Sequence, residues 1–123
     1  MDSSKNQSFA TRLGFAISGL KAGFRTEHSL RTQGLAMALL CIVLLVIRPS
    51  AIWWALGFLT SAVVIAAEFF NTALEQLADH LHPGQHIRIR AVKDSAAAAV
   101  LVVALGAVAV FAALLGAWVA GRC

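Results

Sequence analysis

Three long stretches of the chain carry no charged residue, and they determine the expected architecture. These stretches cover residues 32–47, 50–67 and 95–121. A helix needs about 20 apolar residues, at a rise of about 1.5 Å each, to cross a bilayer. We therefore predict three membrane-spanning helices over residues 29–48, 50–81 and 93–120. The second continues beyond the membrane, and residues 82–92 form the loop that follows it.

The segment ahead of the first span has a different pattern, in which apolar residues recur every three or four positions. On a helix over residues 8–26 these side chains fall within an arc of roughly 100°. Arg12 lies beyond one edge of the arc, and Lys21 and Arg25 lie beyond the other. Such a helix suits the membrane interface, with its cations toward lipid headgroups; the alternative is a soluble helix that packs on the cytoplasmic side of the bundle. Residues 1–8 are polar and no apolar core with a cleavage site follows, so we expect no signal peptide. The apolar set comprises Phe9, Leu13, Ala16, Ile17, Leu20 and Phe24.

The composition narrows the class of protein. Of the 123 residues, 59% are hydrophobic and 13% are charged, whereas a soluble domain is about 45–50% apolar and about 25% charged. A soluble fold of this size has too little interior to hide so much apolar surface. Two cysteines exclude a disulfide scaffold, and a nucleic-acid binder is disfavoured despite a formal net charge of +4. A small integral membrane protein remains.

The basic residues predict the orientation in the membrane. Five of them precede the first uncharged stretch and three lie between the second and third, whereas the turn after the first stretch and the C-terminal end carry one each. Because positive loops face the cytoplasm, we expect the N-terminus and the loop between spans two and three inside. Trp53, Trp54 and Trp118 then lie at the outer boundary, where aromatic belts form.

The end of the second span carries polar residues on one helix face. Asn71, Thr72, Glu75 and Asp79 follow Glu68 at offsets of 3, 4, 7 and 11, which places all five within an arc of about 100°. Three carboxylates on one face repel each other, so we expect a bound cation. Counted from residue 50, Glu68 lies about 27 Å along the helix, near the inner boundary of a hydrocarbon core about 30 Å thick.

The depth of Glu68 makes it the leading functional candidate. Ionisable residues within spans are functional candidates by default, and a partly desolvated glutamate suits a general base. The alternative is a solvated helix end with its charges outward. That alternative accounts for Asp79 and for Glu75 better than for Glu68, which follows a long apolar stretch.

Charges from the other two spans can reach this face. Lys93 and Asp94 open the third span, and the small residues after them let helix backbones approach closely. Lys93 is then a phosphate ligand or, alternatively, an interfacial anchor. Glu27 can supply an oxygen to a hard cation such as Mg²⁺, or simply pair with Arg31 one turn later.

Two other patterns are weaker. Residues 14–21 look like a phosphate-binding loop, but the lysine comes one place late and no strand precedes it. His80, His82 and His86 suggest a transition-metal site, but no cysteine or fixed ligand spacing supports one. We assign no site to either pattern.

The polar positions share their spacing with a known family. The pattern E-x-x-N-T-A-L-E-x-x-x-D over residues 68–79 is followed by K-D-x-x-x-A-A-V over residues 93–100 and preceded by E-x-x-x-R-x-x-G over residues 27–34. Together they resemble the small prokaryotic integral-membrane diacylglycerol kinases and their undecaprenol kinase relatives, over roughly residues 15–101. The resemblance implies an all-α protein of the bacterial inner membrane, with three transmembrane helices after an amphipathic surface helix, assembled as a homotrimer.

The resemblance also implies a reaction and residue roles. The reaction is transfer of the ATP γ-phosphate to a lipid hydroxyl at the cytoplasmic interface. By motif position, Glu68 is the catalytic base, and Glu75 with Glu27 binds Mg²⁺–ATP. The supporting nucleotide contacts are Asn71, Asp79, Lys93 and Asp94. Gln33 departs from the pattern, because the resemblance leads us to expect an acid there.

Two other function classes compete with a kinase. In a small cation channel or transporter the acids would line an ion path, but they cluster at one boundary, and spans one and three carry none at mid-depth. A non-catalytic membrane assembly factor would leave the acidic face unexplained. We therefore expect an ATP-dependent kinase for diacylglycerol, with undecaprenol as the alternative acceptor and no nucleic acid among its partners.

Overall fold

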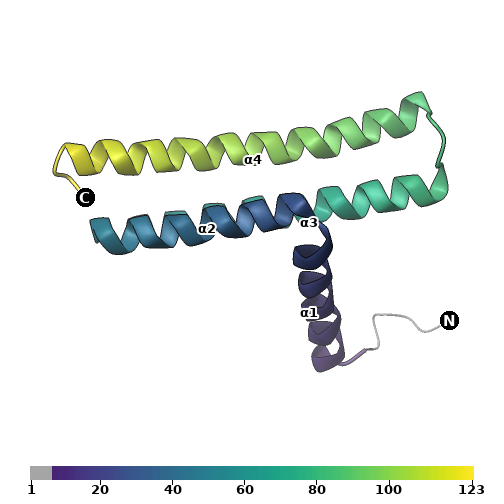
Figure 1. Ribbon diagram of the computed structural model, residues 1–123, viewed down its shortest axis with the longest axis horizontal. Coiled ribbons are helices and arrows are strands. Elements are labelled where there is room, and N and C mark those ends of the chain that lie inside the picture. Colours follow the sequence, from purple (N-terminus) through teal and green to yellow (C-terminus); the bar gives the residue numbers. More distant parts are fainter. Residues whose placement is uncertain (1–6) are drawn as a thin grey trace.

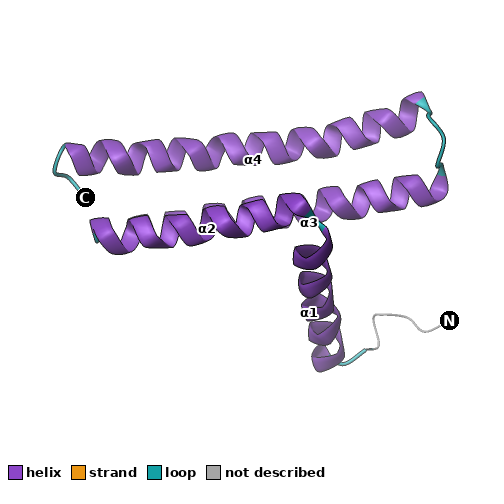
Figure 2. Cartoon of the chain, viewed as in Figure 1, coloured by secondary structure: helices purple, strands orange, loops and turns teal. Residues whose placement is uncertain are grey.

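Residues 7–123 fold into four helices, of which the last three are the long, apolar ones. The computed structural model describes residues 7–123, so Lys5, one of the basic residues used to predict the orientation, lies outside the described residues. The helices are α1 (Phe9–Thr26), α2 (His28–Ile47), α3 (Ala51–Leu81) and α4 (Ile87–Val119). Figure 1 shows α2, α3 and α4 running along one another, with α1 projecting crosswise from the start of α2, and Figure 2 shows only helices and loops.

The three long helices are those that the sequence predicts as membrane spans. Each is long and apolar enough to cross a membrane by its length and composition. The all-α architecture with three such helices after an N-terminal helix is therefore confirmed. At about 1.5 Å per residue, α3 and α4 are roughly 46 and 50 Å long, which exceeds a hydrocarbon core of about 30 Å.

The turn between α2 and α3 is tight. Arg48 ends α2 in a left-handed conformation, with φ 54°, and its N–H donates to the carbonyl of Leu44 at 2.8 Å. Pro49 cannot continue the helix, because its ring clashes with the preceding turn. Ser50 is extended and begins α3 as its N-cap. This short connection makes α2 and α3 antiparallel neighbours.

The connection between α3 and α4 is shorter than the sequence analysis placed it. It covers residues 82–86 rather than 82–92, because α4 begins at Ile87. The prediction followed the charges of Arg88 and Arg90, which interrupt the apolar pattern. Arginine is nevertheless a good helix former, so the helix continues beyond the apolar stretch. His86 caps it by accepting the N–H of Arg88 on Nδ1 at 3.1 Å.

The bundle has a small interior of its own. Outside this interior most large apolar side chains face outward, including Leu45 at 62% and Leu105 at 59% exposure. α1 has no buried residue. Side chains of this kind suit lipid, which is as apolar as they are, better than water. The buried apolar side chains are Leu30, Leu44, Val64, Ala78, Ala96 and Leu114.

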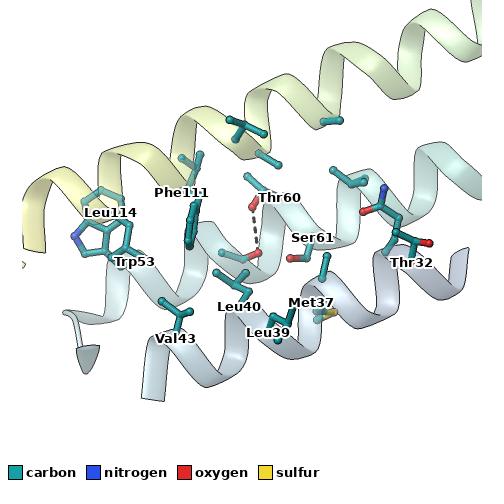
Figure 3. Close-up of a pocket in the computed structure, with 18 residues that line it drawn as sticks. Thr32, Met37, Leu39, Leu40, Val43, Trp53, Thr60, Ser61, Phe111 and Leu114 are labelled. Atoms are coloured by element: carbon teal, nitrogen blue, oxygen red, sulfur yellow. Dashed lines mark hydrogen bonds between the residues drawn. The ribbon is translucent and has the colours of Figure 1, made fainter. Parts of the chain in front are cut away.

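A cavity of about 520 Å³ lies between the three long helices. Figure 3 shows Trp53, Phe111 and Leu114 toward one end of it and Thr32 toward the other. The hydroxyl of Thr60, which also lines it, donates to the carbonyls of Leu56 and Gly57 in its own helix. Val64 lines the cavity one helical turn before Glu68. The cavity therefore approaches the polar face of α3.

Candidate active site

The polar face predicted on the second span lies on α3, and its burial falls along the helix. Glu68 is 7% exposed, Asn71 is half-buried, and Glu75 and Asp79 are exposed. Residues at these offsets share one side of a helix. A single helix therefore carries carboxylates from the interior of the bundle to its surface.

Glu68 is the only buried charged side chain within residues 7–123. In that range its carboxylate has no ion pair and no side-chain hydrogen bond. Burying a charge without a partner is costly. Ionisable groups of this kind inside membrane helices are usually functional. The carboxylate is thus available to accept a proton from a group that reaches it.

Asn71 links the buried and exposed parts of this face. Its Nδ2 donates to Oε1 of Glu75, one turn further on, over a long 3.4 Å. Its Oδ1 is buried and has no partner among the described residues. Buried polar atoms without a partner are uncommon. Asn71 therefore orients Glu75 and also presents an acceptor that a donor or a cation can use.

α4 contributes a cation to the exposed end of the face. Nζ of Lys93 forms an ion pair with Oδ1 of Asp79, the only ion pair in the described part of the chain. The structure thus brings Lys93 to the acidic face. Asp94, one position later on the helix, is exposed and makes no side-chain contact of this kind between residues 7 and 123.

Glu27 stands at the elbow between α1 and α2. Its backbone is extended, and its N–H donates to the carbonyl of Gly23 at 2.8 Å to close α1. Its carbonyl accepts the N–H of Arg31 at 3.2 Å and begins α2. The alternative ion pair between these two side chains is absent from the described residues. The half-buried Glu27 carboxylate is therefore free for a ligand.

An aromatic contact holds this elbow against α3. The rings of Phe24 and Phe69 meet edge to face, with centroids 6.0 Å apart and an interplanar angle of 77°. Phe69 directly follows Glu68 in α3, so the contact fixes this turn of α3 against the end of α1. The sequence analysis assigned no role to Phe69. No periodicity within one sequence signals which apolar side chain meets the end of another helix.

The donor set fits a metal that arrives with a nucleotide. Within residues 7–123, no three His, Cys, Asp or Glu side chains lie close enough to hold an ion by themselves. Mg²⁺ commonly takes one or two carboxylates and fills its other positions with phosphate oxygens and water. Glu27, Glu75 and Asn71 carry donor oxygens of this kind and are the candidates for that role.

The structure gives no support to either weaker sequence pattern. Residues 14–21 lie inside α1 rather than in a loop. The rings of His82 and His86 are 5.1 Å apart, but Nδ1 of His86 already accepts a backbone hydrogen bond. The histidines thus stabilise the α3–α4 connection.

Comparison with known proteins identifies the family. Residues 14–115 match the family model described as prokaryotic diacylglycerol kinase. The chain is 28% identical over 102 residues to the diacylglycerol kinases of Escherichia coli and Shigella flexneri, an alignment that covers 83% of this chain and 84% of each relative. The matched region includes every candidate site residue, from Glu27 to Asp94. The chain therefore belongs to the prokaryotic diacylglycerol kinase family.

Proposed function

We propose that the protein transfers the γ-phosphate of ATP to the hydroxyl of diacylglycerol and so forms phosphatidic acid. Kinases of this family use ATP and a divalent metal, and we propose Mg²⁺ as that metal. One observation carries the proposal: a single helix face runs from the buried Glu68 carboxylate to the exposed Asp79. A membrane-bound hydroxyl can approach the buried end, and a water-soluble nucleotide can approach the exposed end.

Glu68 acts as the general base in this scheme. The lipid hydroxyl oxygen attacks the γ-phosphorus, the bond to the β–γ bridging oxygen breaks, and ADP leaves. The hydroxyl proton passes to the Glu68 carboxylate. Phosphoryl transfer depends mainly on positioning and charge neutralisation, so a base fixed on a long, rigid helix suits the reaction.

The remaining site residues bind the nucleotide. Glu27 and Glu75 hold Mg²⁺, which neutralises phosphate charge when bound, and the Asn71 amide keeps Glu75 in place. Lys93 exchanges its Asp79 partner for a phosphate oxygen. Asp94 is an additional polar contact on the nucleotide side.

The location and the assembly are also proposals. We place the protein in the bacterial inner membrane, with the N-terminus and the loop at residues 82–86 in the cytoplasm, where ATP is present. α1 then lies in the interface, with its exposed apolar residues toward lipid. We also propose a homotrimer, which the resemblance to the family implies.

The decisive experiment is a direct comparison of acceptors. The purified protein in mixed micelles receives Mg²⁺, radiolabelled ATP and either diacylglycerol or undecaprenol. We expect labelled phosphatidic acid. Label on undecaprenol alone would assign the polyprenol as the substrate instead, and no labelled lipid from either would refute the kinase proposal. The Glu68→Gln protein controls for a co-purifying kinase, since loss of a general base lowers the rate by about 10²- to 10⁴-fold.

A further inference from the structure

At the elbow where α1 meets α2, a glycine faces an aromatic ring. A Cβ atom placed on Gly23 would lie 2.9 Å from Cζ of Phe69 and 2.9 Å from Cδ1 of Leu30, and closer still to Cε1 of Phe69. Real Cβ atoms essentially never come within 3.0 Å of other atoms. The ring therefore occupies the space that a side chain at position 23 would fill. We call this pair the Gly23–Phe69 contact.

Neighbouring side chains restrict the Phe69 ring. Phe24 meets the ring edge to face at 6.0 Å between centroids, and Leu30, beside Gly23, is completely buried. An added methyl group would lie 2.9 Å from Cζ and closer still to Cε1, whereas ordinary contact begins at 3.4 Å, so the ring or α1 must shift by more than about 0.5 Å. The Phe69 ring is half-buried, and its edge-to-face contact with Phe24 opposes such a shift.

The contact adjoins site residues on both of its sides. The carbonyl of Gly23 accepts the N–H of Glu27 at 2.8 Å, and Phe69 directly follows Glu68 in α3. Residues 9–22 of α1 are all exposed, and α1 has no buried residue. The end of α1 meets α3 where Gly23 and Phe24 contact Phe69. The position of the elbow against α3 therefore depends on very few side chains.

We propose that the Gly23–Phe69 contact is a positioning pair of matched size, which fixes the Glu27 carboxylate relative to the acidic face of α3. The inference rests on the proposed function, because it concerns the metal-binding role of Glu27. Neither member of the pair touches nucleotide or lipid in that scheme. A misplacement of about 1 Å can cost about 100-fold in rate, so a single methyl group at position 23 is enough to disturb the site.

The test is a size exchange between the two residues. Gly23→Ala adds a methyl group, and Gly23→Ala combined with Phe69→Leu makes room for it. Gly19→Ala is the matched control, because a Cβ there meets nothing within 4 Å on the same helix. Alanine has a higher helix propensity than glycine, so neither Gly23→Ala nor Gly19→Ala weakens α1 itself.

We expect Gly23→Ala to lower kcat/KM for Mg·ATP by about 10- to 100-fold and to shift activation toward higher Mg²⁺ concentration. The double variant recovers most of this loss, and Phe69→Leu alone completes the double-mutant cycle. Gly19→Ala behaves as the wild type. Wild-type kinetics for Gly23→Ala, a double variant as impaired as the single one, or an equal loss in Gly19→Ala would overturn the proposal. A merely structural role would lower the melting temperature without moving the Mg²⁺ dependence.

A distance measurement separates this inference from the proposed function. Spin labels at the exposed Leu20 of α1 and Leu77 of α3, in a Cys41→Ser, Cys123→Ser background that removes the two free cysteines, report the position of α1. We expect Gly23→Ala to shift or broaden the distance distribution and the double variant to restore it. An unchanged distance distribution contradicts the positioning role, whether or not the wild type phosphorylates a lipid. Absence of lipid phosphorylation by the wild type refutes the kinase proposal and leaves the distance test in force.

Discussion

Lys93 should matter much more for activity than for stability, and its ion pair with Asp79 shows why. The two side chains are 35% and 61% exposed, so water screens their attraction. Exposed ion pairs typically contribute about 0–1 kcal/mol. We therefore expect Lys93→Gln to change the free energy of unfolding by less than about 1 kcal/mol.

The effect on catalysis has a different magnitude. If Lys93 contacts phosphate as charge develops in the transition state, its removal costs about 10²- to 10³-fold in kcat/KM, or roughly 3–4 kcal/mol. Lys93→Arg keeps the charge and retains more activity than Lys93→Gln. Asp79→Asn breaks the same ion pair without removing the cation, so we expect a smaller loss, of about tenfold or less.

The two quantities are measured on the same protein samples. Initial rates at saturating lipid give kcat/KM for Mg·ATP, and denaturant titration in micelles gives the free energy of unfolding. A Lys93→Gln protein that is destabilised in proportion to its lost activity would refute the reasoning. So would a Lys93→Gln protein with full activity, because Lys93 would then be only an interfacial anchor.

Three further predictions follow from burial and packing. Glu68→Gln is expected to unfold at a denaturant concentration no lower than the wild type, because it removes an unpaired buried charge; a clear destabilisation in the same titration would show that Glu68 has a structural partner. Asn71→Leu removes the bond to the Glu75 carboxylate and is expected to raise KM for Mg·ATP by about tenfold or more while kcat for the lipid step falls less, because a hydrogen bond to a charged group contributes about 1.5–3 kcal/mol; equal KM values would contradict its orienting role. A side chain on Gly57 would meet Leu40 at 3.2 Å, so Gly57→Leu is expected to destabilise the protein by about 1–3 kcal/mol, whereas Gly106→Leu, with nothing within 4 Å, changes stability little.

The helices could be predicted from the sequence because each leaves a local signature. The uncharged stretches mark the three long helices, and the periodic apolar residues mark α1. The start of α4 was misplaced because hydrophobicity reports where lipid ends, whereas a helix ends where its backbone hydrogen bonds end. Arg88 and Arg90 lie in the gap between these two boundaries.

The candidate site was predictable only along one helix. Helical spacing places Glu68, Asn71 and Glu75 on one face whatever surrounds them. Contacts between helices depend on how the helices pack, which no single sequence spells out. The sequence analysis therefore expected Lys93 to be able to reach the acidic face of α3, but it did not identify Asp79 as its partner. The contact of Phe69 with the end of α1 was not expected.

The small interior of the bundle has a calorimetric consequence. Soluble proteins unfold with a heat-capacity increase of about 12–15 cal/mol/K per residue, because unfolding exposes buried apolar surface to water. In this chain most large apolar side chains already face outward, and in a micelle they remain against hydrocarbon after the helices separate. Its unfolding is therefore expected to show a heat-capacity change well below the soluble value, and its stability curve to be correspondingly flat. The temperature at which the helices separate then depends more on the surrounding lipid or detergent than on the hydration of buried apolar side chains.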